Sequence, residues 1–103
     1  LLNIRDVTDL LLTHGVVNFV VAHNHPSGPA TPSAEDNKFT KALVFGMYLN
    51  NISLLDHIIV GVNDTYSYYH SGLLAEYEKE AERILNIPKP KIAQPRAKYG
   101  DAE

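Results

Sequence analysis

The chain contains no cysteine, and Met47 is its single methionine among 103 residues. Without cysteine it can form neither a disulfide framework nor a thiolate metal site, so any metal ion must be held by histidine and carboxylate side chains. Its apolar runs are far shorter than the roughly 20 residues that span a bilayer, and it opens without a signal-peptide pattern. These absences favour one small domain in the cytoplasm, with no membrane partner.

Basic charge is scarce outside the C-terminal end. Residues 1–87 carry five basic and ten acidic side chains, and the other four basic residues all lie in residues 88–103. An acidic body is a poor surface for phosphate backbones, so we do not expect nucleic acid as a partner except through that end. Prolines, charges and few apolar residues predict that 88–103 is a flexible basic tail after a domain formed by 1–87.

The first part of the chain has the pattern of a helix followed by a strand. Apolar residues at three- and four-residue spacing from Ile4 predict an amphipathic helix that ends at Gly15, where a left-handed cap fits. Residues 16–22 are short, apolar and β-branched, which is typical of an interior strand buried on both faces. Three prolines make residues 26–32 a loop.

The second part predicts helix, strand, hairpin and helix in turn. Ser33 can cap a helix whose inward stripe includes Phe39, Leu43, Gly46, Met47 and Asn50. Residues 54–62 read as a buried strand that turns at Asn63-Asp64 into a hairpin strand at 65–69. Ser71 can cap a last helix that Pro88 stops. The apolar stripe of that helix is Leu74, Tyr77, Ala81, Ile84 and Leu85.

The segment from His23 to Asp36 carries the strongest functional signal. In extended backbone, His23 and His25 point the same way, and Asp36 in the first turn of the next helix can face them across the loop. Two imidazoles and one carboxylate suit a divalent ion, above all Zn²⁺, and leave a fourth position for water. This is the donor set of a hydrolytic site.

Each of these residues also has a simpler interpretation. Asp36 fits the N3 position of a capping box with Ser33, and a His-x-His pair alone is common on surfaces and in cores. The Ser33 hydroxyl can cap the helix, donate to the oxyanion of a tetrahedral intermediate, or do both. For His57, a hydrogen bond to a backbone carbonyl is favoured over a role in orienting a metal ligand.

The spacing of His23, His25, Ser33 and Asp36 resembles the motif of the JAMM (MPN-domain) metalloproteases. The strings from His23 to Gly28 and from Leu55 to Gly61 are similar to the bacterial RadC-like branch, over residues 4 to about 74. The resemblance implies a cytidine-deaminase-like α/β fold, a three-layer mixed sheet flanked by helices. It also implies zinc on His23, His25 and Asp36, and a zinc-activated water that attacks a peptide or isopeptide carbonyl with help from Ser33.

One departure from the motif concerns the general base. The family motif begins with a glutamate on an earlier strand, and no glutamate precedes His23 here; Asp6 and Asp9 lie on the predicted first helix. Because the chain starts at Leu1 without methionine, we expect an N-terminally truncated copy of a longer protein. The alternative is a non-catalytic metal binder, since losing a general base costs about 10²–10⁴-fold in rate.

Three functions follow from this sequence. The first is a zinc hydrolase of peptide or protein substrates, and the second is a metal-binding scaffold without activity. The third is association with nucleic acid, for which only the four basic residues of the tail argue. Proteins of this branch are often labelled DNA repair proteins, but nothing in these residues supports that label. A zinc deaminase is excluded because its Cys-x-x-Cys ligands are missing. The substrate and the oligomeric state are left open.

Overall fold

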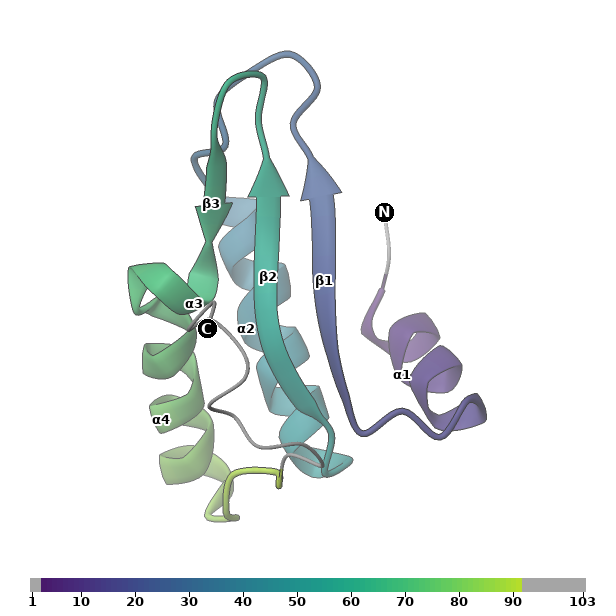
Figure 1. Cartoon of the computed structure of the whole chain (residues 1–103). Coiled ribbons are helices and arrows are strands. Elements are labelled where there is room, and N and C mark those ends of the chain that lie inside the picture. The colour runs from purple at the N-terminus through teal and green to yellow at the C-terminus, as the bar shows by residue number, and fades with distance from the viewer. Residues whose placement is uncertain (1–2, 92–103) are drawn as a thin grey trace, which may run out of the picture.

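The computed structural model describes residues 3–91, which form a three-stranded mixed sheet flanked by helices (Figure 1). The strands β1 (Asn18–Asn24), β2 (Ser53–Val60) and β3 (Thr65–Ser67) lie in the order β1-β2-β3. β1 and β2 are parallel, whereas β2 and β3 are antiparallel. The helices are α1 (Ile4–Thr13), α2 (Ala34–Leu49), α3 (Tyr68–Ser71) and α4 (Leu73–Leu85). The predicted α/β fold with a mixed sheet is confirmed.

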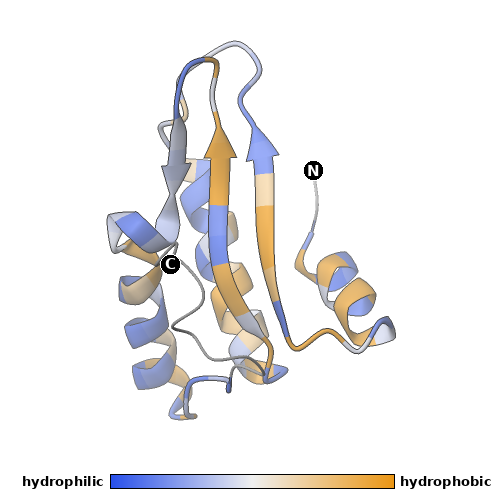
Figure 2. Cartoon of the chain, in the orientation of Figure 1, coloured by the Kyte–Doolittle hydropathy of each residue, from blue (hydrophilic) through white to orange (hydrophobic). Residues whose placement is uncertain are grey.

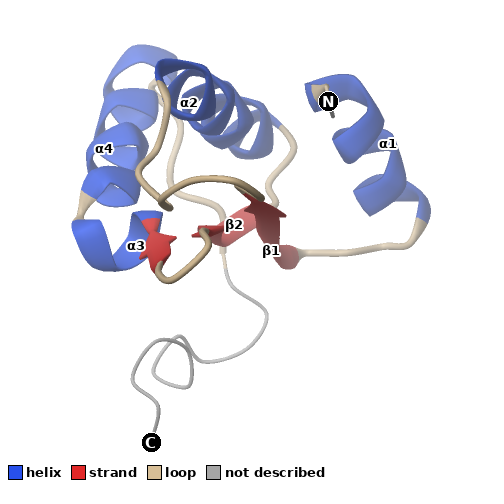
Figure 3. Cartoon of the chain, turned by 90° about the horizontal axis from the view of Figure 1, so that it is seen from above, coloured by secondary structure: helices blue, strands red, loops and turns tan. Residues whose placement is uncertain are grey.

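The three longer helices gather on one side of the sheet. Seen from above, α1, α2 and α4 lie on the same side of the strands (Figure 3). α2 is the crossover that two parallel strands require, and it contacts α1, α4 and β2. This connection brings the N-terminal end of α2 to the end of the sheet where β1 and β2 finish (Figure 1). In residues 3–91 we find no helix long and apolar enough to cross a membrane.

The core lies where α2 and α4 meet β2. Leu43, Met47, Ile59 and Leu74 are at most 1% exposed there. The middle of β2 is nevertheless polar, as the hydrophilic stretch between its apolar ends in Figure 2 shows, because it contains Asp56 and His57. These polar residues are only 2% and 1% exposed, and buried polar groups need hydrogen-bond partners.

β1 differs from the prediction of an interior strand buried on both faces. Among residues 3–91 it pairs only with β2, so it forms an edge of the sheet. Val20 is 44% exposed and Ala22 is also exposed, while the alternate residues Phe19 and Val21 pack against the core. An apolar run cannot by itself reveal that one face of a strand lacks a covering layer.

The hairpin strand is shorter than predicted. It ends at Ser67, and the next four residues form α3, because Ser67 caps that helix through its Oγ, which accepts from the N–H of His70 at 3.0 Å. The buried Asp56 carboxylate also holds this corner, accepting from Ser67 Oγ and from the N–H of Tyr69. Gly72, not Ser71, occupies the N-cap position of α4, with φ at +86°.

The helix ends agree with the sequence in most details. Gly15 has φ of +65° beyond α1, which confirms the left-handed cap, and α4 ends at Leu85 before Pro88. Ile84, predicted to face inward, is 54% exposed because it lies at the margin of the apolar stripe. Asn50 is likewise exposed, as the C-cap of α2 rather than part of its inward face.

Of the segment predicted as a tail, residues 92–103 lie outside the described part of the chain.

Candidate metal centre

His23 and His25 lie at the end of β1 and face the same side. His23 is opposite Ile59 in the parallel ladder, and the N–H of His25 donates to the carbonyl of Val60 at 2.8 Å, which continues the pairing past the strand. Extended backbone therefore holds both residues, and residues two apart share a face. Their ring centroids are 5.2 Å apart. The predicted convergence of the two imidazoles is observed.

Asp36 completes the group from the first turn of α2. Its Oδ1 lies 3.2 Å from His23 Nε2, and its Oδ2 lies 3.1 Å from His25 Nε2. One ligand atom from each of the three residues can be chosen so that all lie within 4.8 Å of one another. In a tetrahedral zinc site with bonds of roughly 2.0 Å, ligand atoms are separated by roughly 3.3 Å. The donor set and its spacing therefore fit a metal ion.

Capping and metal ligation, weighed as alternatives for Asp36, can coexist. The side chain of Ser33 accepts from the N–H of Asp36 at 3.0 Å, and Asp36 Oδ2 accepts from the N–H of Ser33 at 2.8 Å, which completes a capping box. The same carboxylate faces both imidazoles. The cap thus fixes the orientation of the carboxylate with respect to the histidines.

The surroundings of Asp36 favour its charged form. Burial by itself would raise the pKa of Asp36, but the hydrogen bonds from Ser33, followed by the charges of His23 and His25, hold that pKa below its ordinary value. The side chain is 14% exposed, compared with 37% for His23 and 24% for His25. An anionic, partly buried carboxylate beside two imidazoles is suited to a cation.

His57 departs from the favoured prediction, because both of its ring nitrogens contact side chains rather than a backbone carbonyl. Its Nε2 is 2.9 Å from His23 Nδ1, and its Nδ1 is 2.6 Å from Thr40 Oγ1. The ring also stacks on Tyr68 at a centroid distance of 4.9 Å. Burial, and next the charge of His23, lower the pKa of His57 to about 4, so its ring is neutral at neutral pH.

The loop at residues 26–32 is pinned to the turn between β2 and β3. The Asp64 side chain accepts from the N–H of Ala30 at 3.0 Å, and the N–H of Val62 donates to the carbonyl of Gly28 at 3.0 Å. The loop also contacts the preceding residue, because the carbonyl of Pro29 lies 3.0 Å from His25 Nδ1. The loop is thus attached both to a metal-facing ring and to the sheet.

The sequence did not predict that Thr40 and Asp64 contribute to the surroundings of the site. Thr40 lies four residues after Asp36 and so on the same face of α2, which is a signal that the sequence does carry. Asp64 was assigned only to a turn, and its contact with Ala30 joins positions 34 residues apart. Such a contact has no local signature in the sequence.

An open groove runs beside the group of His23, His25 and Asp36. It has a volume of about 450 Å³ and is lined by His25, Pro26, Ser27, Gly28, Pro29, Thr31 and Ser33. Its walls are mostly the proline-rich loop. His25 and Ser33 are the two lining residues that belong to the predicted site. An extended chain lying in this groove would contact His25, one of the three candidate ligands, and Ser33.

The model of the RadC-like JAB domain family matches residues 1–73. The chain belongs to this family. A UPF0758 protein of Burkholderia cenocepacia (strain HI2424) is 43% identical over 70 residues, which cover 68% of the chain and 27% of that relative. A UPF0758 protein of Janthinobacterium sp. (strain Marseille) is 40% identical over 70 residues, which cover 68% of the chain and 31% of that relative. The chain thus spans about a third or less of the length of these curated relatives.

The part shared with the RadC-like JAB domain family contains the whole candidate site. His23, His25, Ser33 and Asp36 lie within the matched residues, and so does His57. The match ends at Leu73, the first residue of α4. Family membership thus gives the site a JAMM-like scaffold, with a His-His-Asp group that could hold a metal ion.

Proposed function

We propose that this domain is a zinc-dependent hydrolase of peptide or isopeptide bonds, with His23, His25 and Asp36 as the zinc ligands. The observation that carries the proposal is the convergence of two imidazole Nε2 atoms on one carboxylate, at 3.1 and 3.2 Å. When bound by three protein ligands, zinc supplies an acidified water and a Lewis acid that polarises a carbonyl. The sequence pattern, the geometry and the family each support this assignment.

Ser33 is the proposed catalytic residue of this chain. Its Oγ accepts from the N–H of Asp36, and an accepting hydroxyl keeps its own hydrogen to donate. Ser33 lines the groove, so an amide placed there can receive a hydrogen bond on its carbonyl oxygen as negative charge develops. Donors of this kind are worth about 10²–10³-fold in rate.

The general base is not among the candidate site residues of the described chain. Within residues 3–91 the group that could hold a metal contains no glutamate, and the neighbouring Glu35 is exposed on α2. Asp6 and Asp9 lie on α1 and are also exposed. We therefore assign the base to the glutamate that the motif places upstream of His23, and activity is to be assayed on the full-length protein.

Zinc binding is the first test. Protein purified without a histidine tag and stripped of metal should bind about one equivalent of Zn²⁺ in a calorimetric titration. His25→Ala should abolish this binding, whereas His14→Ala, which removes an exposed ring at the end of α1, should not alter it. Uptake of less than about a tenth of an equivalent by the unsubstituted protein would refute the metal site.

A scaffold that binds metal without catalysis is the second candidate, because the described residues offer no glutamate at the site. Zinc-loaded full-length protein, incubated with fluorescence-quenched peptides and with an isopeptide-linked peptide, separates the two functions. Cleavage that disappears in His23→Ala supports the hydrolase. Zinc binding without cleavage of any of these probes favours the scaffold.

A further inference from the structure

A line of three polar side chains connects α2, β2 and β1 behind the candidate metal site. We propose that Thr40 and His57 act as positioning residues, which fix the tautomer of His23 so that its Nε2 lone pair faces Asp36. The purpose of this arrangement rests on the proposed zinc site. The tautomer itself is a property of the metal-free protein and can be measured there.

The direction of the hydrogen bonds starts at Thr40. Its hydroxyl donates to the carbonyl oxygen of Asp36 at 2.7 Å, and that oxygen can only accept. A hydroxyl has one hydrogen, so Thr40 Oγ1 must accept in its contact with His57 Nδ1 at 2.6 Å. The hydrogen of the His57 ring therefore lies on Nδ1.

The tautomer of His57 then determines that of His23. A neutral imidazole carries one N–H, so His57 Nε2 is an acceptor. It lies 2.9 Å from His23 Nδ1, which must be the donor. The remaining nitrogen of His23, Nε2, is left with its lone pair toward Asp36 Oδ1 at 3.2 Å.

His25 reaches the same state by a separate route. Its Nδ1 lies 3.0 Å from the carbonyl of Pro29, which can only accept, so the hydrogen of His25 lies on Nδ1 as well. Its Nε2 lone pair then faces Asp36 Oδ2 at 3.1 Å. The Nδ1 hydrogens of the two rings thus bind different acceptors, an imidazole for His23 and a carbonyl for His25. In both rings the Nε2 lone pair is left facing Asp36.

This arrangement concentrates electron pairs at one point. Two lone pairs and a carboxylate face one another at 3.1 and 3.2 Å, which is repulsive unless a cation lies between them. The reverse direction would place a hydrogen on His23 Nε2, but His57 Nδ1 would then have to accept, and Thr40 would lose its bond to the Asp36 carbonyl. Thr40 and His57 thus hold His23 ready for a metal at the expense of a hydrogen bond to Asp36.

The test is the tautomeric state of each ring in metal-free protein. Histidine is labelled with ¹⁵N, and long-range ¹⁵N–¹H spectra are recorded at about pH 8.5, where ordinary imidazoles are neutral. We expect the protonated nitrogen to be Nδ1 in His23, His25 and His57. A hydrogen on Nε2 of His23 in the unsubstituted protein would overturn the proposal without any variant.

Two variants of Thr40 form a matched pair. Thr40→Val keeps the shape but cannot accept from His57, so we expect the hydrogens of His57 and His23 to move to Nε2 and zinc affinity to fall about 10–100-fold. Thr40→Ser keeps the hydroxyl and should retain the original tautomers and affinity. His25 is the internal reference, because its Pro29 acceptor does not involve Thr40.

Failure of this inference and failure of the zinc site give different results. Unchanged tautomers and zinc affinity in Thr40→Val would overturn the positioning role while leaving the metal site intact. The expected tautomers in a protein that takes up no zinc would overturn the proposed function and leave the hydrogen-bond assignment standing. A merely structural role for Thr40 would lower stability in both variants without moving a hydrogen between ring nitrogens.

Discussion

The Asp36 carboxylate contacts the N–H of Ser33 as well as the two imidazoles, so its roles in capping and ligation can be separated by substitution. Asp36→Ala removes both, and we expect the unfolding free energy of the metal-free protein to fall by about 1 kcal/mol and zinc binding to disappear. Asp36→Asn keeps an oxygen that can accept from Ser33. Its stability should stay within about 0.5 kcal/mol of the original, while zinc affinity falls at least about tenfold. Urea unfolding and zinc titration measure the two quantities.

A control for this comparison is available one residue away. Glu35→Ala removes an exposed carboxylate from the same helical turn, and it should leave zinc affinity unchanged. If Asp36→Asn were as unstable as Asp36→Ala, the cap would depend on charge rather than on an acceptor oxygen, and the two roles could not be divided in this way.

His57 makes the stability of the metal-free protein depend on pH. Burial, and then His23, lower the pKa of His57 from 6.5 to about 4, so between these values the unfolded chain binds a proton that the folded chain does not. The free energy of unfolding is therefore unaffected by protonation of His57 above about pH 6.5, where the ring is neutral in both states. It decreases as the pH falls from about 6.5 toward about 4. At 1.36 kcal/mol per pKa unit, the loss is about 3 kcal/mol. Urea unfolding over this range measures it.

His57→Phe isolates this contribution, because a phenyl ring can still stack on Tyr68 but does not titrate. We expect the free energy of unfolding of this variant to depend less steeply on pH between about 6.5 and 4. If the unfolding free energies of the two proteins depended equally on pH, folding would not lower the pKa of His57.

At the scale of elements, the loop at residues 26–32, which follows His25, depends on a glycine in the turn after β2. A Cβ on Gly61 would lie 2.5 Å from the N of Ala30 and 2.9 Å from the C of Pro29, both backbone atoms that cannot move aside. Gly61→Ala should displace the loop, lower the unfolding free energy by about 1–3 kcal/mol and weaken zinc binding. Urea unfolding and calorimetric zinc titration are the measurements.

Gly28 offers a matched control in the same loop. A Cβ there would meet nothing within 4 Å, so Gly28→Ala should leave zinc affinity and stability close to those of the original protein. Similar losses in both variants would mean that the loop responds to any added side chain, and the close approach at Gly61 would not be the cause.

The sequence predicted the elements that local pattern determines. The three longer helices were found from their periodic apolar positions, whereas the short α3, which Ser67 caps, was predicted as strand. The convergence of His23, His25 and Asp36 was also found, because it follows from strand alternation and helix spacing. The partners of His57 were not predicted, since its contact with His23 joins residues 34 apart. The exposure of Val20 was missed for a related reason: whether a face of a strand is covered depends on what packs against it, which the strand's own residues do not encode.

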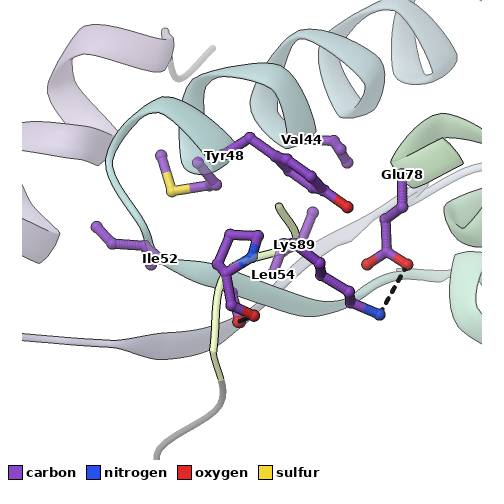
Figure 4. A pocket seen from close by; sticks show the side chains of 9 residues that line it. Val44, Tyr48, Ile52, Leu54, Glu78 and Lys89 are labelled. Atoms are coloured by element: carbon purple, nitrogen blue, oxygen red, sulfur yellow. Dashed lines mark hydrogen bonds and ion pairs between the residues drawn. The ribbon is translucent and has the colours of Figure 1, made fainter. Parts of the chain in front are cut away.

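At the scale of the whole molecule, the candidate site and the C-terminal end of the described chain occupy opposite ends of β2. Ser53, which begins β2, donates through Oγ to the carbonyl of Pro90 at 3.2 Å, and Lys89 pairs with Glu78 at 3.2 Å. The pocket there, shown in Figure 4, has a volume of about 10 Å³, which holds about one water at most. This end of the molecule is suited to stabilising the fold, while the open groove lies at the other end, beside His25.

Because the two ends of the sheet differ in this way, shortening the chain should change its stability but not its affinity for zinc. A chain that ends at Ile87 loses the buried Pro90 and its hydrogen bond from Ser53, so we expect its unfolding free energy to be about 2 kcal/mol below that of a chain ending at Lys91. Zinc affinity should be the same in both, because the candidate ligands lie at the far end of the sheet. Urea unfolding and zinc titration of the two chains test this.

Lys89→Ala in the chain ending at Lys91 separates the ion pair from the packing. The Lys89 side chain is 44% exposed, and exposed pairs contribute less than about 1 kcal/mol, so most of the loss should come from residues around Pro90 rather than from this charge. Equal stability of the chains ending at Ile87 and Lys91 would show that the contacts of Pro90 with the start of β2 contribute nothing. A fall in zinc affinity on shortening would instead mean that the two ends of the sheet are coupled. Such coupling would have to pass along β2, because Pro90 contacts the start of this strand and the candidate ligands lie near its end.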